Sequence, residues 1–124
     1  MSEPTMSYCK VLAFVSGILM YAAQSHVYAE SQAEYAENAR SSWQQQNKLM
    51  EESYSRLLSE AEAEPNKEPA QQLRIAKDQW EEFRNSFCRS VSKTYGGQWQ
   101  SVHESECRVK LTNQLRETTD SYGW

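Results

Sequence analysis

After residue 30 the chain is interrupted strongly at only two places, and this most constrains its fold. The first is the segment 64–69, Glu-Pro-Asn-Lys-Glu-Pro, and the second is the pair Gly96-Gly97. Elsewhere Ala, Glu, Gln, Arg, Lys and Leu dominate, and these are strong helix formers. No stretch alternates like a strand, and no repeat is evident. The sequence therefore predicts an all-α domain of three main helices.

The first predicted helix opens at Ser31, where Ser31-Gln32-Ala33-Glu34 forms a capping-box pattern. Apolar residues then recur on one helical face. These are Ala36, Trp43, Met50, Tyr54, Leu57 and Ala61. We expect this face to pack across the other two helices.

The second predicted helix begins at Pro69 and ends near Tyr95, with Gly96 free to take the left-handed conformation that closes many helices. Its apolar positions have spacings of 3 and 4, which predicts that they form the core. They are Leu73, Ala76, Trp80, Phe83 and Phe87. Arg84 lies one position from this stripe and is expected to organise helix packing by pairing with a carboxylate, such as Asp78, Glu81 or one on the first helix.

The third predicted helix begins with a second capping box at Ser101 and fades beyond Thr118. Its apolar positions lie four residues apart, and they are Cys107, Leu111 and Leu115.

The first thirty residues differ from the rest. Lys10 precedes an apolar run, residues 11–23, and a small-x-small exit follows at residues 27–29. This pattern is typical of a secretory signal peptide, with cleavage near Ala29 and translation starting at Met1 or Met6. The run is too short for a stable membrane anchor. We therefore expect residues 30–124 to be a single helical domain in the periplasm or secreted.

Cleavage would leave two cysteines, Cys88 and Cys107, and two cysteines in a small exported chain indicate one disulfide. Cys88 lies eight residues before Gly96, and Cys107 lies ten residues after Gly97. At about 1.5 Å per residue, both lie roughly 12–15 Å from the turn. They are therefore expected to clamp the last two helices as an antiparallel hairpin.

The charge balance excludes some function classes. The chain has 13 basic and 17 acidic residues, and removing Lys10 and Glu3 with the leader leaves 12 and 16, a net charge of −4. This gives no basic footprint for nucleic acid, and it would suit a cationic partner.

No catalytic, metal or cofactor site is predicted. The exported part has a single histidine, His103, and no CxxC motif. Carboxylates that are adjacent in sequence, such as Glu81 and Glu82, point to different sides of a helix. We therefore expect a binding protein and no enzyme.

The second half resembles a known family, the LprI-type lysozyme inhibitors. Residues 73–88, Leu-Arg-Ile-Ala-Lys-Asp-Gln-Trp-Glu-Glu-Phe-Arg-Asn-Ser-Phe-Cys, are similar to its L-x-x-A-Q-x-x-W-x-x-[YF]-R-[DN]-x-x-C signature. Lys77 replaces the usual Gln. Gly96-Gly97 follows, then Cys107 with Leu111-Thr112 and Arg116, and upstream residues 47–58 resemble the helix that opens the family's domain. The likeness covers about residues 44–118 and implies an exported protein that inhibits a lysozyme.

The turn between the last two helices is the candidate partner-binding segment. It consists of Tyr95, Gly96, Gly97, Gln98 and Trp99. Two aromatic residues flank a flexible turn, and such residues often anchor protein interfaces. Packing of Tyr95 or Trp99 back over the hairpin end is the competing interpretation. Trp80 and Phe83 are expected to serve packing.

We expect the chain to bind and inhibit a lysozyme or a related peptidoglycan hydrolase. Two other roles stay open: an immunity protein that neutralises another exported toxin, and an accessory module that docks onto an envelope complex without inhibiting anything. Formation of a homodimer through an exposed apolar stripe is also left open.

Overall fold

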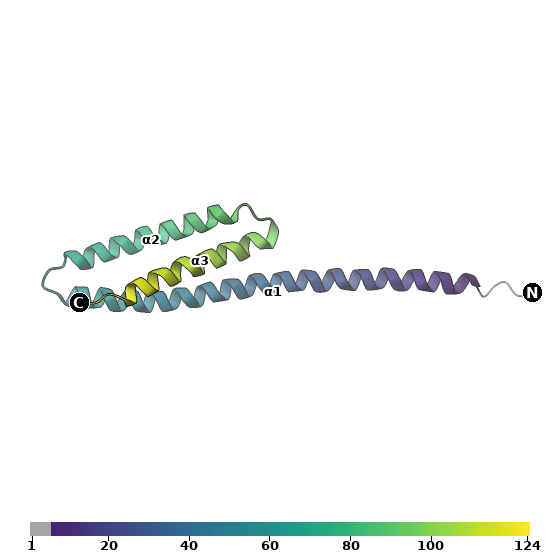
Figure 1. Ribbon diagram of the computed structural model, residues 1–124, viewed down its shortest axis with the longest axis horizontal. Helices are drawn as coiled ribbons and strands as arrows, with labels where there is room; N and C mark the ends of the chain where they lie inside the picture. The colour runs from purple at the N-terminus through teal and green to yellow at the C-terminus, as the bar shows by residue number, and fades with distance from the viewer. Residues whose placement is uncertain (1–5) are drawn as a thin grey trace, which may run out of the picture. The chain divides into compact units, whose positions relative to one another are not determined.

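A computed structural model of the chain describes the backbone of residues 6–124 and the side chains of residues 31–124. It contains three helices, α1 (Met6–Ala63), α2 (Glu68–Ser92) and α3 (Gly97–Asp120), and no strand occurs in this part of the chain (Figure 1). The described chain divides between Glu34 and Tyr35 into two units, and the second unit holds α2, α3 and the part of α1 that begins at Tyr35. The predicted all-α architecture of three main helices is confirmed.

The predicted start of the first helix at Ser31 is wrong. α1 is helical on both sides of this residue, and its sequence contains no proline that would stop it. The predicted signal peptide, residues 1–29, lies outside the residues whose side chains are described. Among the described residues, no helix combines the length and apolar character needed to cross a membrane.

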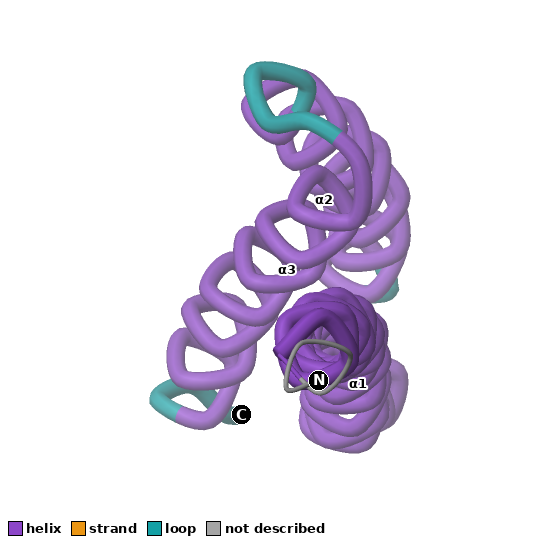
Figure 2. Tube along the Cα trace, turned by 90° about the vertical axis from the view of Figure 1, so that its right-hand side faces the viewer, coloured by secondary structure: helices purple, strands orange, loops and turns teal. Residues whose placement is uncertain are grey.

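The α2–α3 hairpin is confirmed. α2 begins at Glu68, where Asn66 Oδ1 accepts a hydrogen bond from the Glu68 backbone N–H at 3.1 Å and Pro69 occupies the first turn. α2 and α3 run antiparallel, and a short turn joins them at the top of Figure 2. The disulfide Cys88–Cys107 links them with a Cα–Cα distance of 5.5 Å. The two helices are therefore held in register by a covalent bond.

The turn itself differs from the prediction. α2 ends at Ser92 instead of Tyr95, because the backbone N–H groups of Lys93 and Tyr95 donate to Ser90 O and Ser92 O and tighten the last turn. Gly96 has a φ of −95°, whereas Gly97 has a φ of 56° and opens α3. The left-handed glycine is therefore Gly97, and α3 begins four residues before the predicted capping box at Ser101.

The buried face of α1 matches the prediction over its last four apolar positions. Met50, Tyr54, Leu57 and Ala61 are all buried, and the Tyr54 hydroxyl donates a hydrogen bond to the Leu73 carbonyl on α2. Trp43, further along the same face, is half-buried. α1 therefore supplies most of the large apolar side chains of the core.

The predicted core face of α2 is wrong. Phe83 and Phe87 are 53% and 44% exposed, whereas Arg84 and Cys88, one position further along, are buried. The buried face of α2 is completed by Ala70 and Ser92, with Leu73, Lys77 and Trp80 half-buried. The fully buried residues of α2 are small apart from Arg84, and they fit against the bulky side chains of α1.

The inward face of α3 is more polar than predicted. Its buried residues are Val102, Ser105, Thr112 and Thr119, while Leu111 and Leu115 are only half-buried. Small hydroxyl residues let α3 approach both neighbouring helices closely.

Arg84 joins the three helices at one level of the bundle. Its guanidinium lies over two tryptophan rings, 4.8 Å from the centroid of Trp43 on α1 and 4.6 Å from that of Trp80 on α2. Its Nη1 donates to Asn47 Oδ1 at 2.6 Å and to Thr112 Oγ1 at 3.1 Å. Two neutral oxygens therefore take the place of the carboxylate that was predicted to pair with Arg84. Burial of the guanidinium lowers the pKa of Arg84.

The C-terminal segment closes the end of the bundle opposite the α2–α3 turn. Arg56 Nη2 on α1 donates to the carbonyls of Thr119 and Tyr122 at 3.0 and 3.1 Å. The backbone N–H of Trp124 donates to Glu60 Oε2 at 3.2 Å. These contacts fix α3 against α1 at the end of the bundle that lies away from the turn.

Lys77 joins two carboxylates from different helices. Its Nζ lies 2.7 Å from Glu51 Oε2 on α1 and 3.0 Å from Glu81 Oε1 on α2. Burial opposes the charged form of Lys77, but hydrogen bonds to the two carboxylates raise its pKa. The hydrogen bond from Lys77 lowers the pKa of Glu81 below its usual value of 4.5. Lys77 occupies the position at which the signature that residues 73–88 resemble has a glutamine.

The cluster makes stability depend on pH in a defined direction. The pKa of Glu81 is lower in the folded state than in the unfolded state. The contribution of ionised Glu81 to the free energy of unfolding is therefore complete above about pH 4.5 and is lost as the pH falls through the lowered pKa. Because the pKa of Lys77 is raised in the folded state, the contribution of its charged form to stability is lost only above pH 10.5. We expect Lys77→Met to reduce the acid-dependent fall in the free energy of unfolding by about 0.5 kcal/mol, since both carboxylates are partly exposed. Urea titrations at pH 7 and pH 3 measure this difference. The exposed Lys48→Met serves as the control, and an equal acid-dependent fall in wild type and Lys77→Met would contradict the prediction.

Candidate functional site

The predicted binding segment forms the turn at one end of the α2–α3 hairpin. All five of its residues, from Tyr95 to Trp99, are exposed. Glycine is required at Gly97, whose φ of 56° is strained for other residues. A Cβ added at Gly96 or Gly97 would meet no atom within 4 Å, so the turn is open on its outer side. The end of the hairpin is thus narrow and bare of side chains at its centre.

The two aromatic residues of the turn pack against different helices. Tyr95 stacks on His103 of α3, with 3.5 Å between ring centroids, and His103 Nδ1 lies 3.6 Å from Glu106 Oε2. Trp99 packs against Tyr35 of α1 with its ring tilted and the centroids 6.0 Å apart. Packing back over the hairpin end therefore occurs, yet Trp99 and Tyr35 remain 42% and 56% exposed. The aromatic surfaces stay available to a partner.

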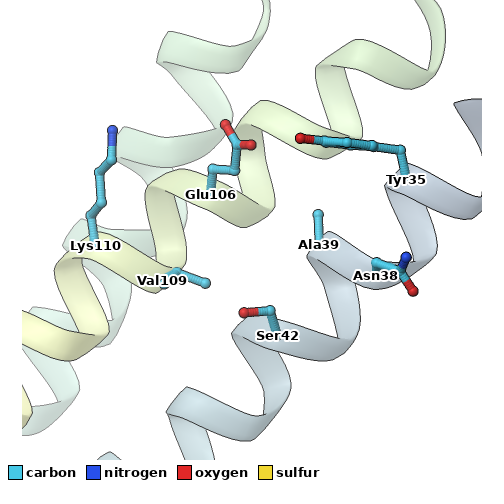
Figure 3. A pocket seen from close by; sticks show the side chains of 7 residues that line it. All are labelled: Tyr35, Asn38, Ala39, Ser42, Glu106, Val109 and Lys110. Atoms are coloured by element: carbon cyan, nitrogen blue, oxygen red, sulfur yellow. The ribbon is translucent and has the colours of Figure 1, made fainter.

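A groove runs from this aromatic pair between α1 and α3. Its volume is about 390 Å³, and its lining is more apolar than polar. Figure 3 shows the Tyr35 hydroxyl and the Ser42 hydroxyl directed from α1 towards α3, with Val109 pointing into the space between the helices. The lining residues are Tyr35, Asn38, Ala39, Ser42, Glu106, Val109 and Lys110. We name this the α1/α3 groove.

The charges beside the groove come from α3. Glu106 and Lys110 lie one turn apart on the exposed side of α3, and Figure 3 shows Lys110 extending away from the groove. The groove combines polar side chains with an exposed aromatic pair at one end, and aromatic residues are enriched at protein interfaces. The arrangement is suited to receiving side chains of a partner.

The remaining predicted site residues have structural surroundings. Trp80 lies against Arg84 in the core, and Cys88 and Cys107 form the disulfide. Phe83 is exposed on the opposite side of the hairpin and belongs to a different surface. Sequence reasoning missed Tyr35 because it lies far from the turn in the chain, and only the packing of α1 against α3 brings it to Trp99.

No group of three or more His, Cys, Asp or Glu side chains in the described part of the chain is placed to hold a metal ion. Two carboxylates from different helices, Glu51 and Glu81, lie on either side of Lys77 and both pair with it. The hydrogen bond from Lys77 lowers the pKa of Glu81, which does not suit a general acid.

The comparison with protein families agrees with this fold. The family model described as "Lysozyme inhibitor LprI" matches residues 22–117, which is most of the chain and includes all of α2 and nearly all of α3. No curated protein and no solved structure matches the chain. The match includes the disulfide, the Trp80–Arg84 layer and the Tyr95–Trp99 turn, and the chain belongs to the LprI lysozyme inhibitor family.

Proposed function

We propose that the protein binds a lysozyme or a related peptidoglycan hydrolase and inhibits it by obstructing the substrate cleft. The family match over residues 22–117 supports the class of target. The exposed Tyr35–Trp99 pair at the end of the hairpin is the observation that supports the location of the contact.

The chemistry of the target suits this surface. Lysozymes cleave with a carboxylic acid of raised pKa and a second carboxylate inside an open cleft. The glycine turn is narrow enough to enter such a cleft, Gln98 offers an amide to carboxylates, and Trp99 offers an apolar face. The net charge of −4 favours encounter with a cationic enzyme. Inhibition by this route needs no chemistry from the inhibitor, which accords with a protein that is no enzyme.

The same proposal places the protein outside the cytoplasm. Its target acts on the cell wall, and residues 11–29 carry the apolar run and small-x-small exit of a secretory leader. The disulfide Cys88–Cys107 suits an oxidising compartment. Export and cleavage near Ala29 are therefore part of the proposal.

Substitution of Trp99 tests the location of the contact. We expect Trp99→Ala to raise the inhibition constant for the target lysozyme about 30-fold, the loss of about 2 kcal/mol typical of an aromatic anchor. Tyr35→Ala should weaken inhibition in the same assay to a smaller extent, since it supports Trp99 from α1.

Trp124→Ala is the matched control, because Trp124 is an exposed tryptophan bound near Glu60 at the other end of the bundle. It should leave inhibition unchanged. Equal inhibition by Trp99→Ala and wild type, with both proteins helical and oxidised, would contradict placement of the contact at the turn.

A further inference from the structure

A second exposed surface adjoins the α1/α3 groove along the edge of α3 that carries Glu106 and Lys110. Four large exposed side chains occur at intervals of four residues, Phe83, Phe87 and Val91 on α2 and Tyr95 in the turn that follows it. Each is more than two-fifths exposed, and the rings of Phe83 and Phe87 stack with 5.4 Å between centroids. A continuous apolar line of this kind on a small protein marks an interaction surface.

The line borders hollows on both sides. A groove of about 360 Å³ between α2 and α3 is lined by Phe87, Val91, Tyr95 and Leu111, with Glu106 and Lys110 at its α3 edge among others. A shallower hollow on the outer side of α2 is lined by Phe83 and Phe87 with polar neighbours. Phe87 lines both hollows and is therefore the centre of the surface. We call the whole surface the α2/α3 face.

From this face we infer that the protein forms a two-fold symmetric dimer in which the α2/α3 faces of two copies pack together with their α2 helices antiparallel. In a two-fold contact each residue meets its counterpart across the axis. With the axis at the level of Phe87, Phe87 meets the partner's Phe87, and Phe83 meets the partner's Val91. A large side chain thus opposes a smaller one on either side of the centre.

The charges on α3 fit the same axis. Because the disulfide sets Cys88 level with Cys107, Phe87 lies level with residue 108 of α3. Glu106 and Lys110 lie two residues before and after that level, about 3 Å to either side. Two-fold rotation therefore places Glu106 opposite the partner's Lys110, and Lys110 opposite the partner's Glu106. One axis thus satisfies both the apolar line on α2 and the charge pair on α3, which favours a second copy over an unrelated partner.

The test is the mass of the oxidised protein, purified from the periplasm of an expression host, by light scattering after size-exclusion chromatography at increasing concentration. Wild type should approach twice the mass of one chain. Phe87→Lys should weaken the dimer at least about 100-fold, because the substitution occurs twice at the axis. Leu49→Lys is the matched control, since Leu49 is 37% exposed on α1 outside this face, and it should still dimerise.

Charge reversal tests the register. Glu106→Lys and Lys110→Glu should each weaken the dimer about 10-fold, because like charges then face each other. The double variant E106K/K110E should restore it, since the exchanged charges again pair across the axis. A wild-type protein that stays monomeric at every concentration overturns the inference. A dimer that resists Phe87→Lys, or a double variant weaker than both single variants, overturns it equally.

Discussion

Removing the disulfide with Cys88→Ala and Cys107→Ala together is expected to lower the free energy of unfolding by about 3 kcal/mol. The bond closes a loop with a sequence separation of 19, and the entropy gained by the unfolded chain when the bond is lost corresponds to this value. For a domain of this size the melting temperature should fall by about 15 °C. Thermal and urea unfolding followed by circular dichroism measure both quantities.

The reduced wild-type protein is the control for this pair of substitutions. Cys88 is fully buried, so alanine at this position removes a sulfur atom as well as the bond. Reduction breaks the bond and keeps both sulfur atoms, and it should produce most of the same loss. A fall in melting temperature of less than about 5 °C in both samples would show that helix packing alone sets the register of the hairpin.

Replacing Arg84 with alanine should cost about 3 kcal/mol, a large fraction of the stability of a small domain. The side chain is 4% exposed, and its guanidinium covers the faces of Trp43 and Trp80. Its loss leaves a space between the two rings and removes the donor that Asn47 and Thr112 share. Urea unfolding at pH 7 measures the change, and the tryptophan fluorescence should shift as the rings are exposed.

Two variants make this prediction specific. Arg84→Lys should recover less than half of the loss, because an ammonium group cannot lie flat between two rings while donating to both neutral oxygens. Arg89→Ala, at an exposed position one turn further along α2, should change stability by less than about 0.5 kcal/mol. Full recovery by lysine would show that charge, and not the planar stacking, gives Arg84 its role.

The hairpin was predictable because its determinants are local. The distances of Cys88 and Cys107 from the glycine pair are nearly equal, and this places them side by side in any antiparallel arrangement. The face of α1 was also predictable, since Met50, Tyr54 and Leu57 recur at helical spacing and all three are buried. In both cases spacing along one helix was sufficient.

The face of α2 was not predictable from spacing alone. Apolar periodicity placed Phe83 and Phe87 inside, but the helix is rotated so that Arg84 and Cys88 point inward. The cause lies on the other helices: Trp43 on α1 offers a ring for the guanidinium, and Thr112 on α3 offers an acceptor. Such a pairing depends on residues 28 to 41 positions away in the sequence. The exposed phenylalanines are the visible consequence of this rotation.

The candidate binding site was predictable only in part. The glycine turn and its aromatic neighbours identified the hairpin end, but the contribution of Tyr35 depends on how α1 packs against α3. The start of α3 at Gly97 was missed because its N-cap, Gly96, has no capping side chain that the sequence could signal, and the early start brings Trp99 into the first turn. Trp99 is consequently held by a helix instead of a flexible loop.

The most direct test of the proposed function is a titration of c-type, g-type and i-type lysozymes with the oxidised protein purified from a periplasm, following binding, cell-wall lysis and cleavage of a soluble oligosaccharide. We expect one class to lose activity stoichiometrically on both substrates, because a blocked cleft excludes small and large substrates alike. Absence of binding to every class, by protein shown to be helical and disulfide-bonded, would contradict the inhibitor function. It would direct attention to the immunity and accessory roles.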